Sequence, residues 1–326
     1  MASSEQLKAL VESHLSQDDA RFLSITLQVA AHEARKGHNV LAQELKDLVE
    51  QSKKKNNKNK VLSIAQSVTD PTLLTSFQPK NKLRDLITTE EIKNKLARVI
   101  QEQRCIVKLK NHGLAPRRRI LLVGPPGTGK TFTASILAGE LGYPLFLVRL
   151  DALISKFMGE SSVKLRQVFD AINAVRGVYF FDEFDALGSQ RSQQQDVGEA
   201  RRILNSFLQM IEQDDSNSLV ICATNHIEIL DHALFRRFDD VIRYELPQSE
   251  EIITLFKKRL EPFVDQGFNW SVLPDFALGL SNAEITRAAE EALKDALLND
   301  LELVTFSMVQ NAIKDRRDMR SNLNPR

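Results

Sequence analysis

The chain has 326 residues, of which 42% are hydrophobic and 27% are charged, so it has room for two or three globular domains. Its formal net charge of +1 gives no overall field that would attract nucleic acid or an anionic membrane. No stretch approaches the ~20 apolar residues of a membrane span, and the first residues lack the apolar run of a secretory signal. We therefore expect a cytoplasmic protein without a membrane partner.

Residues 1–52 are expected to form a helical hairpin. Apolar side chains recur there at helical spacing, and the stretch Gly37-His38-Asn39 interrupts the pattern before it resumes. A hairpin of this size buries little surface of its own. It either docks on the main domain or acts as a module that binds substrate or a partner.

Residues 53–80 are expected to form a basic, flexible linker. They begin with "KKKNNKNK", which offers nothing to bury. A lysine run of this length is usually solvated, although it could also contact nucleic acid or an acidic partner.

Residues 81–246 alternate between short apolar runs and amphipathic stretches. The apolar runs lie at 120–123, 144–150, 177–185 and 218–225, and three of them end in polar residues. This alternation predicts an α/β domain with a doubly wound parallel sheet, whose ligands collect at the carboxyl ends of the strands. Residues 247–320 have an all-helical pattern, which predicts a small helical domain after the sheet.

The stretch "GPPGTGKT" at 124–131 follows the first of these runs and precedes a helix. Such a glycine-rich turn directs backbone N–H groups at phosphate oxygens, and the helix adds its positive end. Lys130 is expected to reach the β- and γ-phosphates, and the Thr131 hydroxyl to ligate Mg²⁺. The predicted ATP site comprises Gly124, Pro125, Pro126, Gly127, Thr128, Gly129, Lys130, Thr131 and Phe132.

Polar residues at later strand ends supply the remaining chemistry. Asp182 suits Mg²⁺ and Glu183 suits polarising the attacking water, which is what phosphoanhydride hydrolysis needs. Asn225 could orient that water, or it could be an ordinary turn residue. Arg236 and Arg237 could form surface ion pairs, or they could reach the γ-phosphate of a neighbouring subunit.

With these motifs in this order, residues 83–318 resemble the AAA clade of the AAA+ ATPases. Residues 124–131 match Walker A, and 178–183 match Walker B, in which Asp182 and Glu183 are the functional side chains. Asn225 falls at sensor 1, and the two arginines fall at the arginine-finger pair. The stretch "GLSNAEI" (279–285) resembles the lid motif GxSxADI. The resemblance implies further contacts with adenine from Leu86, Ile87, Gly279 and Ala283.

The resemblance also implies a motor that threads protein. The stretch "ISKFMGESS" is similar to a pore loop of the clade, and its residues Lys156, Phe157, Met158 and Gly159 would grip an extended polypeptide. The alternative is that Phe157 packs beneath a loop. Arg201 and Arg202 fall where intersubunit arginines occur. Members of the clade usually form hexamers, so the resemblance predicts a homo-oligomeric ring that remodels or unfolds a polypeptide.

Two other functions stay open. One is a nucleic-acid loader, which the lysine linker and the arginines at 117–119 favour and the near-neutral charge opposes. The other is an ATP-dependent switch that controls a partner enzyme without threading. The organisation also resembles small bacterial AAA proteins that work beside a separate enzyme. Some of those are encoded with subtilisin-like proteases and are associated with phage defence, so a protease from another chain is an expected partner.

Overall fold

A computed structural model describes residues 8, 13, 19–38, 41–49, 72–153, 160–187, 196–226 and 235–323. The chain divides into two compact units, Met1–Ile64 and Ala65–Arg326. In the first unit, α2 (Asp19–Arg35) and a helical segment at 41–49 follow one another across a turn at Gly37. The His38 ring lies 2.6 Å from a carboxylate oxygen of Glu33 at that turn. These two helices correspond to the predicted hairpin.

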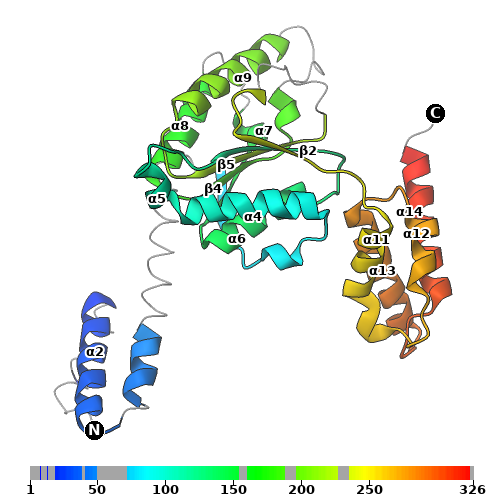
Figure 1. Ribbon diagram of the computed structural model, residues 1–326, viewed down its shortest axis with the longest axis horizontal. Coiled ribbons are helices and arrows are strands. Elements are labelled where there is room, and N and C mark those ends of the chain that lie inside the picture. Colours follow the sequence, from blue (N-terminus) through cyan, green and yellow to red (C-terminus); the bar gives the residue numbers. More distant parts are fainter. Residues whose placement is uncertain are drawn as a thin grey trace. The chain divides into compact units, whose positions relative to one another are not determined.

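The second unit contains a six-stranded sheet (Figure 1) in the order β1-β3-β4-β5-β2-β6. Its strands are β1 (Leu74–Phe77), β2 (Arg119–Val123), β3 (Leu145–Val148), β4 (Val178–Phe181), β5 (Leu219–Thr224) and β6 (Asp240–Arg243). β2 to β6 are parallel to one another, and β1 pairs antiparallel with β3. The central strands β4 and β5 are buried along their whole length, as expected for a sheet covered on both faces. The predicted α/β class is confirmed.

Two strands lie where the sequence pattern predicted none. β1 falls within 53–80, the range predicted as a linker, because Leu73 and Leu74 are buried and the short run pairs with β3. β6 begins two residues after Phe238 and pairs with β2. Both are four-residue edge strands, and a run this short carries little periodic signal.

Helices cover both faces of the sheet. α4 (Glu90–Arg104) and α6 (Lys130–Leu141) lie on one face in Figure 1, and α8 (Glu160–Ala174) and α9 (Asp196–Gln213) lie on the other. α4 buries Ile92, Leu96, Val99 and Ile100, which are its predicted apolar stripe. Shorter elements are η1 (Leu83–Asp85), α5 (Ile106–Lys110), α7 (Leu150–Leu153) and η2 (Phe184–Leu187).

The helices after β6 have a hydrophobic core of their own, and we call them the lid. They are α11 (Ser249–Leu260), η4 (Glu261–Phe263), η5 (Trp270–Val272), α12 (Leu273–Ala277), α13 (Asn282–Leu298) and α14 (Phe306–Leu323). α13 packs against α11 and α14 through its alanines, including Ala288, Ala289 and Ala292. Small side chains on one face let neighbouring helices approach closely.

Charged groups pair with one another at the amino ends of β2 and β6. The Arg118 guanidinium donates to a carboxylate oxygen of Asp214 at 3.0 Å and to the Ser216 carbonyl oxygen. The Asp239 carboxylate accepts from the backbone N–H groups of Arg118 and Arg119 at 2.8 and 2.9 Å. Arg117 pairs with Asp240 at 3.1 Å. We call this network the amino-edge cluster.

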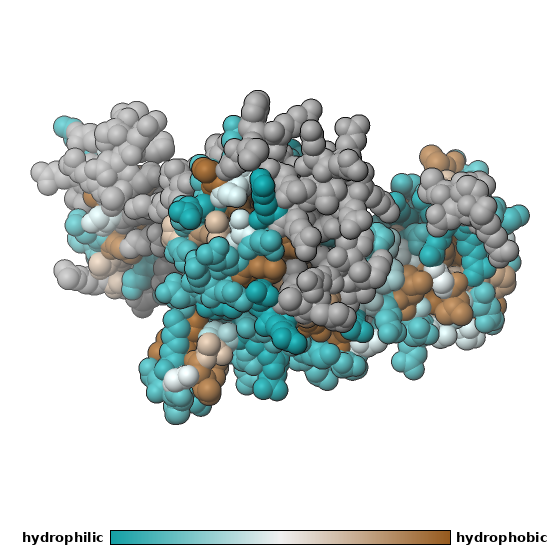
Figure 2. Space-filling model, turned by 90° about the horizontal axis from the view of Figure 1, so that it is seen from above, coloured by the Kyte–Doolittle hydropathy of each residue, from teal (hydrophilic) through white to brown (hydrophobic). Residues whose placement is uncertain are grey.

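The part of the surface that is coloured in Figure 2 is mostly hydrophilic, with hydrophobic side chains in small patches between polar ones. Among the residues that the structure describes, no helix is both long enough and apolar enough to cross a membrane.

Candidate functional site

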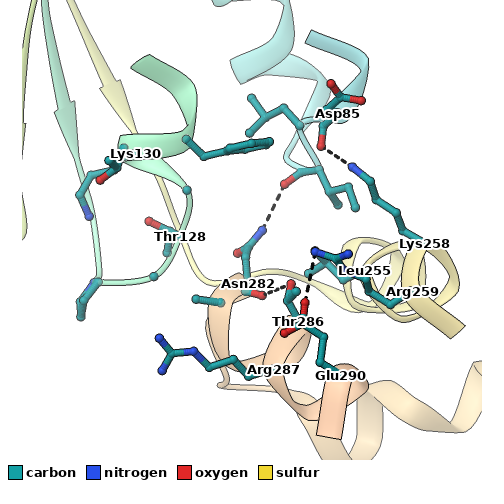
Figure 3. A pocket seen from close by; sticks show the side chains of 18 of the residues that line it. Asp85, Thr128, Lys130, Leu255, Lys258, Arg259, Asn282, Thr286, Arg287 and Glu290 are labelled. Carbon is teal, nitrogen blue, oxygen red and sulfur yellow. Dashed lines mark hydrogen bonds and ion pairs between the residues drawn. The ribbon is translucent and has the colours of Figure 1, made fainter. Parts of the chain in front are cut away.

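A pocket of about 630 Å³ lies between the carboxyl edge of the sheet and the lid. Most of the predicted phosphate-binding residues line it, and Figure 3 shows the side chains that reach it from each side. The predicted lining residues are Leu86, Ile87, Pro126, Gly127, Thr128, Gly129, Lys130, Thr131, Phe132, Asp182, Glu183, Asn225 and Ala283. Residues that lie up to about 200 positions apart in the sequence therefore meet at one site.

The loop from 124 to 129 needs its glycines for conformation and for space. Gly127 and Gly129 have φ angles of +76° and +102°, which other residues rarely adopt. A Cβ atom on Gly124 would lie 2.3 Å from the carbonyl oxygen of Tyr244, and one on Gly127 would lie 2.6 Å from the Ser281 hydroxyl oxygen. The loop is thus packed between the end of β6 and the first turn of α13.

Lys130 begins α6 and is buried beneath the loop. Its ammonium donates to the carbonyl oxygens of Gly124 and Pro125 at 2.6 and 2.8 Å. Burial lowers the pKa of this ammonium, and the negative charges of Asp182 and Asp185 oppose only part of that effect. An anionic ligand would stabilise the charged form, so the loop is electrostatically suited to phosphate.

Asp182 and Glu183 follow β4 directly. One oxygen of Asp182 accepts from the Thr131 hydroxyl at 2.8 Å, and the other accepts from the backbone N–H of Glu183 at 2.9 Å. The backbone of Glu183 is left-handed, with φ of +50°, and the residue is exposed toward the pocket. The two groups predicted for Mg²⁺ are therefore in direct contact, and the predicted base lies beside them.

Asn225 follows β5 and is held by a residue that the sequence pattern did not single out. A carboxylate oxygen of Asp185, in η2, accepts from the Thr224 hydroxyl at 2.9 Å and from the backbone N–H of Asn225 at 3.3 Å. This bridge fixes the end of β5 against the segment after β4. It places the Asn225 carboxamide on the wall that also carries Glu183.

The segment that contains Leu86 and Ile87 is tied both to α6 and to the lid. The Leu83 N–H donates to Glu140 at 3.0 Å, and the Lys258 ammonium donates to the Asp85 carbonyl oxygen at 2.7 Å. The Asn282 carboxamide donates to the Ile87 carbonyl oxygen at 3.1 Å (Figure 3). Leu86, Ile87 and Leu255 give this end of the pocket the apolar surface that a nucleobase requires.

Charged lid residues line the pocket, and sequence reasoning missed them. Arg259 pairs with Glu290 at 3.3 Å, and Arg287, on α13, also lines the pocket (Figure 3). The only local signal was the stretch "GLSNAEI", which identified the start of α13. Nothing in the sequence of α11 indicates that Lys258 and Arg259 face a ligand site.

The other predicted residues lie elsewhere. Arg236 is exposed, and Arg237 forms an ion pair with Glu212 at 2.8 Å; neither is among the residues that line the pocket. Gly279 also lies outside the lining, and its carbonyl oxygen accepts from Arg320. Arg202 is exposed on α9. Lys156, Phe157, Met158 and Gly159, together with the side chain of Arg201, lie outside the described residues.

Comparison with known proteins places this geometry in a family. Residues 120–246 match the model of the ATPase family associated with various cellular activities (AAA). The chain is also 31% identical to an uncharacterized AAA family ATPase, y4kL, of Sinorhizobium fredii, over 98% of this chain and 97% of that protein. The chain belongs to the AAA family of ATPases. The predicted family and the predicted ATPase activity are confirmed.

Other relatives of this AAA ATPase match over shorter spans. A proteasome-activating nucleotidase of Saccharolobus islandicus is 33% identical over 65% of this chain and 56% of its own length. The ATP-dependent zinc metalloprotease FtsH 3 of Sphaerobacter thermophilus is 32% identical over 72% of this chain and 50% of its own length. The chain thus spans about half the length of these two relatives.

Proposed function

We propose that this AAA ATPase is a ring-forming motor that couples Mg²⁺-dependent ATP hydrolysis to the remodelling, unfolding or threading of a polypeptide. The observation that carries the proposal is the convergence of Lys130, Thr131, Asp182, Glu183 and Asn225 on one pocket. Lys130 binds phosphate, Glu183 polarises the attacking water, and Asn225 orients that water. Leu86, Ile87 and Ala283 lie beside the adenine base.

The residues fit a Mg²⁺ ion. The Thr131 hydroxyl and the Asp182 carboxylate are oxygen donors 2.8 Å apart, and Mg²⁺ in nucleotide sites is usually held by one or two protein groups with phosphates and waters. When bound, Mg²⁺ would neutralise negative charge on the phosphates. Thr131 and Asp182 would hold it, directly or through water.

The positions of Arg236 and Arg237 support an ATP site that is completed by a second copy of the chain. Arg236 is exposed, and Arg237 lies against Glu212 instead of the pocket. An arginine that stabilises transition-state charge must reach the phosphates. We infer that both act on the pocket of a neighbouring copy, as in a hexameric ring.

Mixing two inactive variants tests this arrangement. Glu183→Gln retains the arginines, and the double variant Arg236→Ala, Arg237→Ala retains the base. If the arginines act between copies, a mixture of the two contains some complete sites and regains turnover, as measured by phosphate release. If mixed rings form, as shown by co-purification of two different tags, and no turnover returns, the arrangement between copies is wrong.

A polypeptide substrate is supported by two of the relatives, which are named as an ATP-dependent metalloprotease and a nucleotidase that activates the proteasome. The loader alternative loses one of its supports, because the arginines at 117–119 take part in the amino-edge cluster. A separately encoded protease would be a partner of the motor.

A substrate trap distinguishes threading from a switch. Glu183→Gln purified with ATP from its native cells should retain a protein, and mass spectrometry would identify it. Adding Phe157→Ala should release that protein, whereas Phe263→Ala, at a phenylalanine exposed on the lid, should not. Retained nucleic acid, or a protein indifferent to Phe157, would favour a loader or a switch.

A further inference from the structure

The residue that follows β6 touches the start of the phosphate-binding loop. The backbone N–H of Tyr244 donates to the Val123 carbonyl oxygen at 2.7 Å. The carbonyl oxygen of Tyr244 lies where a side chain at Gly124 would have to be, only 2.3 Å from an ideal Cβ. The chain then runs from Tyr244 to the first lid helix, which begins at Ser249. The loop and the connection to the lid are therefore packed against each other.

The side chain of Tyr244 makes a second connection, through Thr133. Their hydroxyl oxygens are 2.6 Å apart, and the Thr133 hydroxyl also donates to the Gly129 carbonyl oxygen at 3.0 Å. A threonine hydroxyl has one proton, and a carbonyl oxygen can only accept, so the Tyr244 hydroxyl must be the donor to Thr133. The result is a relay with one direction, from Tyr244 through Thr133 to Gly129.

The relay is enclosed in an apolar core. Thr133 is fully buried and Tyr244 is 3% exposed, and Tyr244 packs in the same cluster as Leu122, Ala134 and Ile242. Buried hydroxyl groups cost free energy unless they are paired, so the pair favours one arrangement of the two side chains. The Gly129 carbonyl oxygen, one residue before Lys130, also accepts from the backbone N–H of Thr133 at 2.9 Å, and the relay adds a side-chain bond to the same oxygen.

The lid also touches the loop from its other side. The backbone N–H of Ala283, at the start of α13, donates to the Gly127 carbonyl oxygen at 3.0 Å. The loop is thus bonded to the end of β6 through Gly129 and to α13 through Gly127. Movement of the lid about the connection at 245–248 would act directly on the loop at Gly127, and on Gly129 through Tyr244, the residue next to that connection.

We propose that Tyr244 and Thr133 are positioning residues that fix the phosphate-binding loop and link its geometry to the segment from which the lid extends. The inference rests on the proposed role of the loop in binding ATP. Tyr244 and Thr133 do not touch the nucleotide. They act through Gly129.

Removing the hydroxyls singly tests the relay. Tyr244→Phe and Thr133→Val keep the packing and should each raise the Kd for ATP by roughly three- to tenfold, which corresponds to one lost hydrogen bond. Thr133→Ser keeps the hydroxyl and should bind ATP like the wild type. The double variant should be no weaker than Thr133→Val, because both changes break one relay.

Tyr179→Phe is the matched control. Tyr179 is a buried tyrosine of the same sheet, and its single hydroxyl proton is shared between the carbonyl oxygens of Ala171, in α8, and Val175, just after it, at 2.7 and 2.9 Å. Its loss should lower resistance to denaturant without changing the Kd for ATP. If Tyr244→Phe and Thr133→Val behave like Tyr179→Phe, with lower stability and an unchanged Kd, the relay is only structural and the inference fails.

A separate variant tests the premise. Lys130→Ala should lose ATP binding whether or not the relay matters. If it binds ATP as tightly as the wild type, the loop is not the phosphate site, and the proposed function fails independently of Tyr244.

Discussion

At the amino edge of the sheet, Arg118 lies against Asp214, and the backbone of β2 lies against Asp239. At the carboxyl edge of the same strand, Lys130 lies under a loop, and the partners that the described residues offer its ammonium are the backbone carbonyl oxygens of Gly124 and Pro125. The first edge compensates its charges internally and is complete without a ligand. The second leaves a buried cation short of negative charge. Paired charges indicate stability, and an undercompensated cation in a pocket indicates a binding site.

The largest expected effect is at the carboxyl edge. Lys130→Ala should lower ATP turnover by at least about 100-fold, because it removes the cation that lies under the predicted phosphate-binding loop. The same change should leave the free energy of unfolding nearly unchanged, since it removes an ammonium whose pKa burial already lowers. Phosphate release and urea unfolding measure the two quantities. The prediction is contradicted if Lys130→Ala lowers the free energy of unfolding but leaves the rate of ATP turnover unchanged. The carboxyl edge would then serve stability, as the amino edge does.

The second effect is at the amino edge. Asp214→Ala leaves the largely buried Arg118 without its carboxylate and should cost about 3 kcal/mol in the free energy of unfolding. Asp151→Ala is the matched control, because it breaks an arginine–aspartate pair whose two side chains are 49% and 70% exposed. Urea unfolding of the control should match the wild type. Equal losses from both variants would show that burial does not decide the strength of these pairs.

A smaller effect concerns Gly139, where α6 meets the segment before η1. A Cβ atom there would lie 2.2 Å from the Asn81 carbonyl oxygen, so Gly139→Ala should displace the segment that carries Leu86 and Ile87. We expect weaker ATP binding and a loss of roughly 1–3 kcal/mol in stability. Gly142→Ala is a comparison in which the added Cβ has nothing within 4 Å, although its φ of +69° adds strain of a different origin. If Gly139→Ala binds ATP as tightly as the wild type, the position of the segment that carries Leu86 and Ile87 does not affect ATP binding.

The smallest effect is a dependence on pH. The backbone N–H of Leu83 is the main cause that lowers the pKa of Glu140, and Lys82 and Arg104 add to it. Because the folded-state pKa lies below its ordinary value of 4.5, this stabilisation is present above 4.5 and is lost as the pH falls through the folded-state value. Glu140→Gln should flatten the acid side of the curve of stability against pH. A curve that superposes on that of the wild type would exclude Glu140 as a contributor.

The sequence predicted what is local. Gly124 to Thr131 and the acids after β4 could be recognised because short, contiguous patterns specify a turn and a strand end. The family resemblance added Leu86 and Ala283. The class of the fold followed from alternating apolar runs, whereas the edge strands β1 and β6 were missed because four residues show no period.

What could not be predicted depends on tertiary contacts. Thr133 and Tyr244 are 111 positions apart, and neither has a sequence context that points to the other. The arginines at 117–119 looked like a basic patch because their partners, Asp214, Asp239 and Asp240, come about 100 residues later. Lys258 is exposed on one side of a helix, and only folding shows which side faces the pocket.

The left-handed backbone at Glu183 implies that the residue needed for ATP hydrolysis lowers the stability of the fold. An L-residue in that conformation costs roughly 1–2 kcal/mol, and glycine would avoid the cost. A Glu183→Gly protein should therefore resist denaturant at least as well as the wild type while losing hydrolysis. If only stability were selected, glycine would be favoured at position 183. A glutamate is retained there only while ATP hydrolysis contributes to fitness.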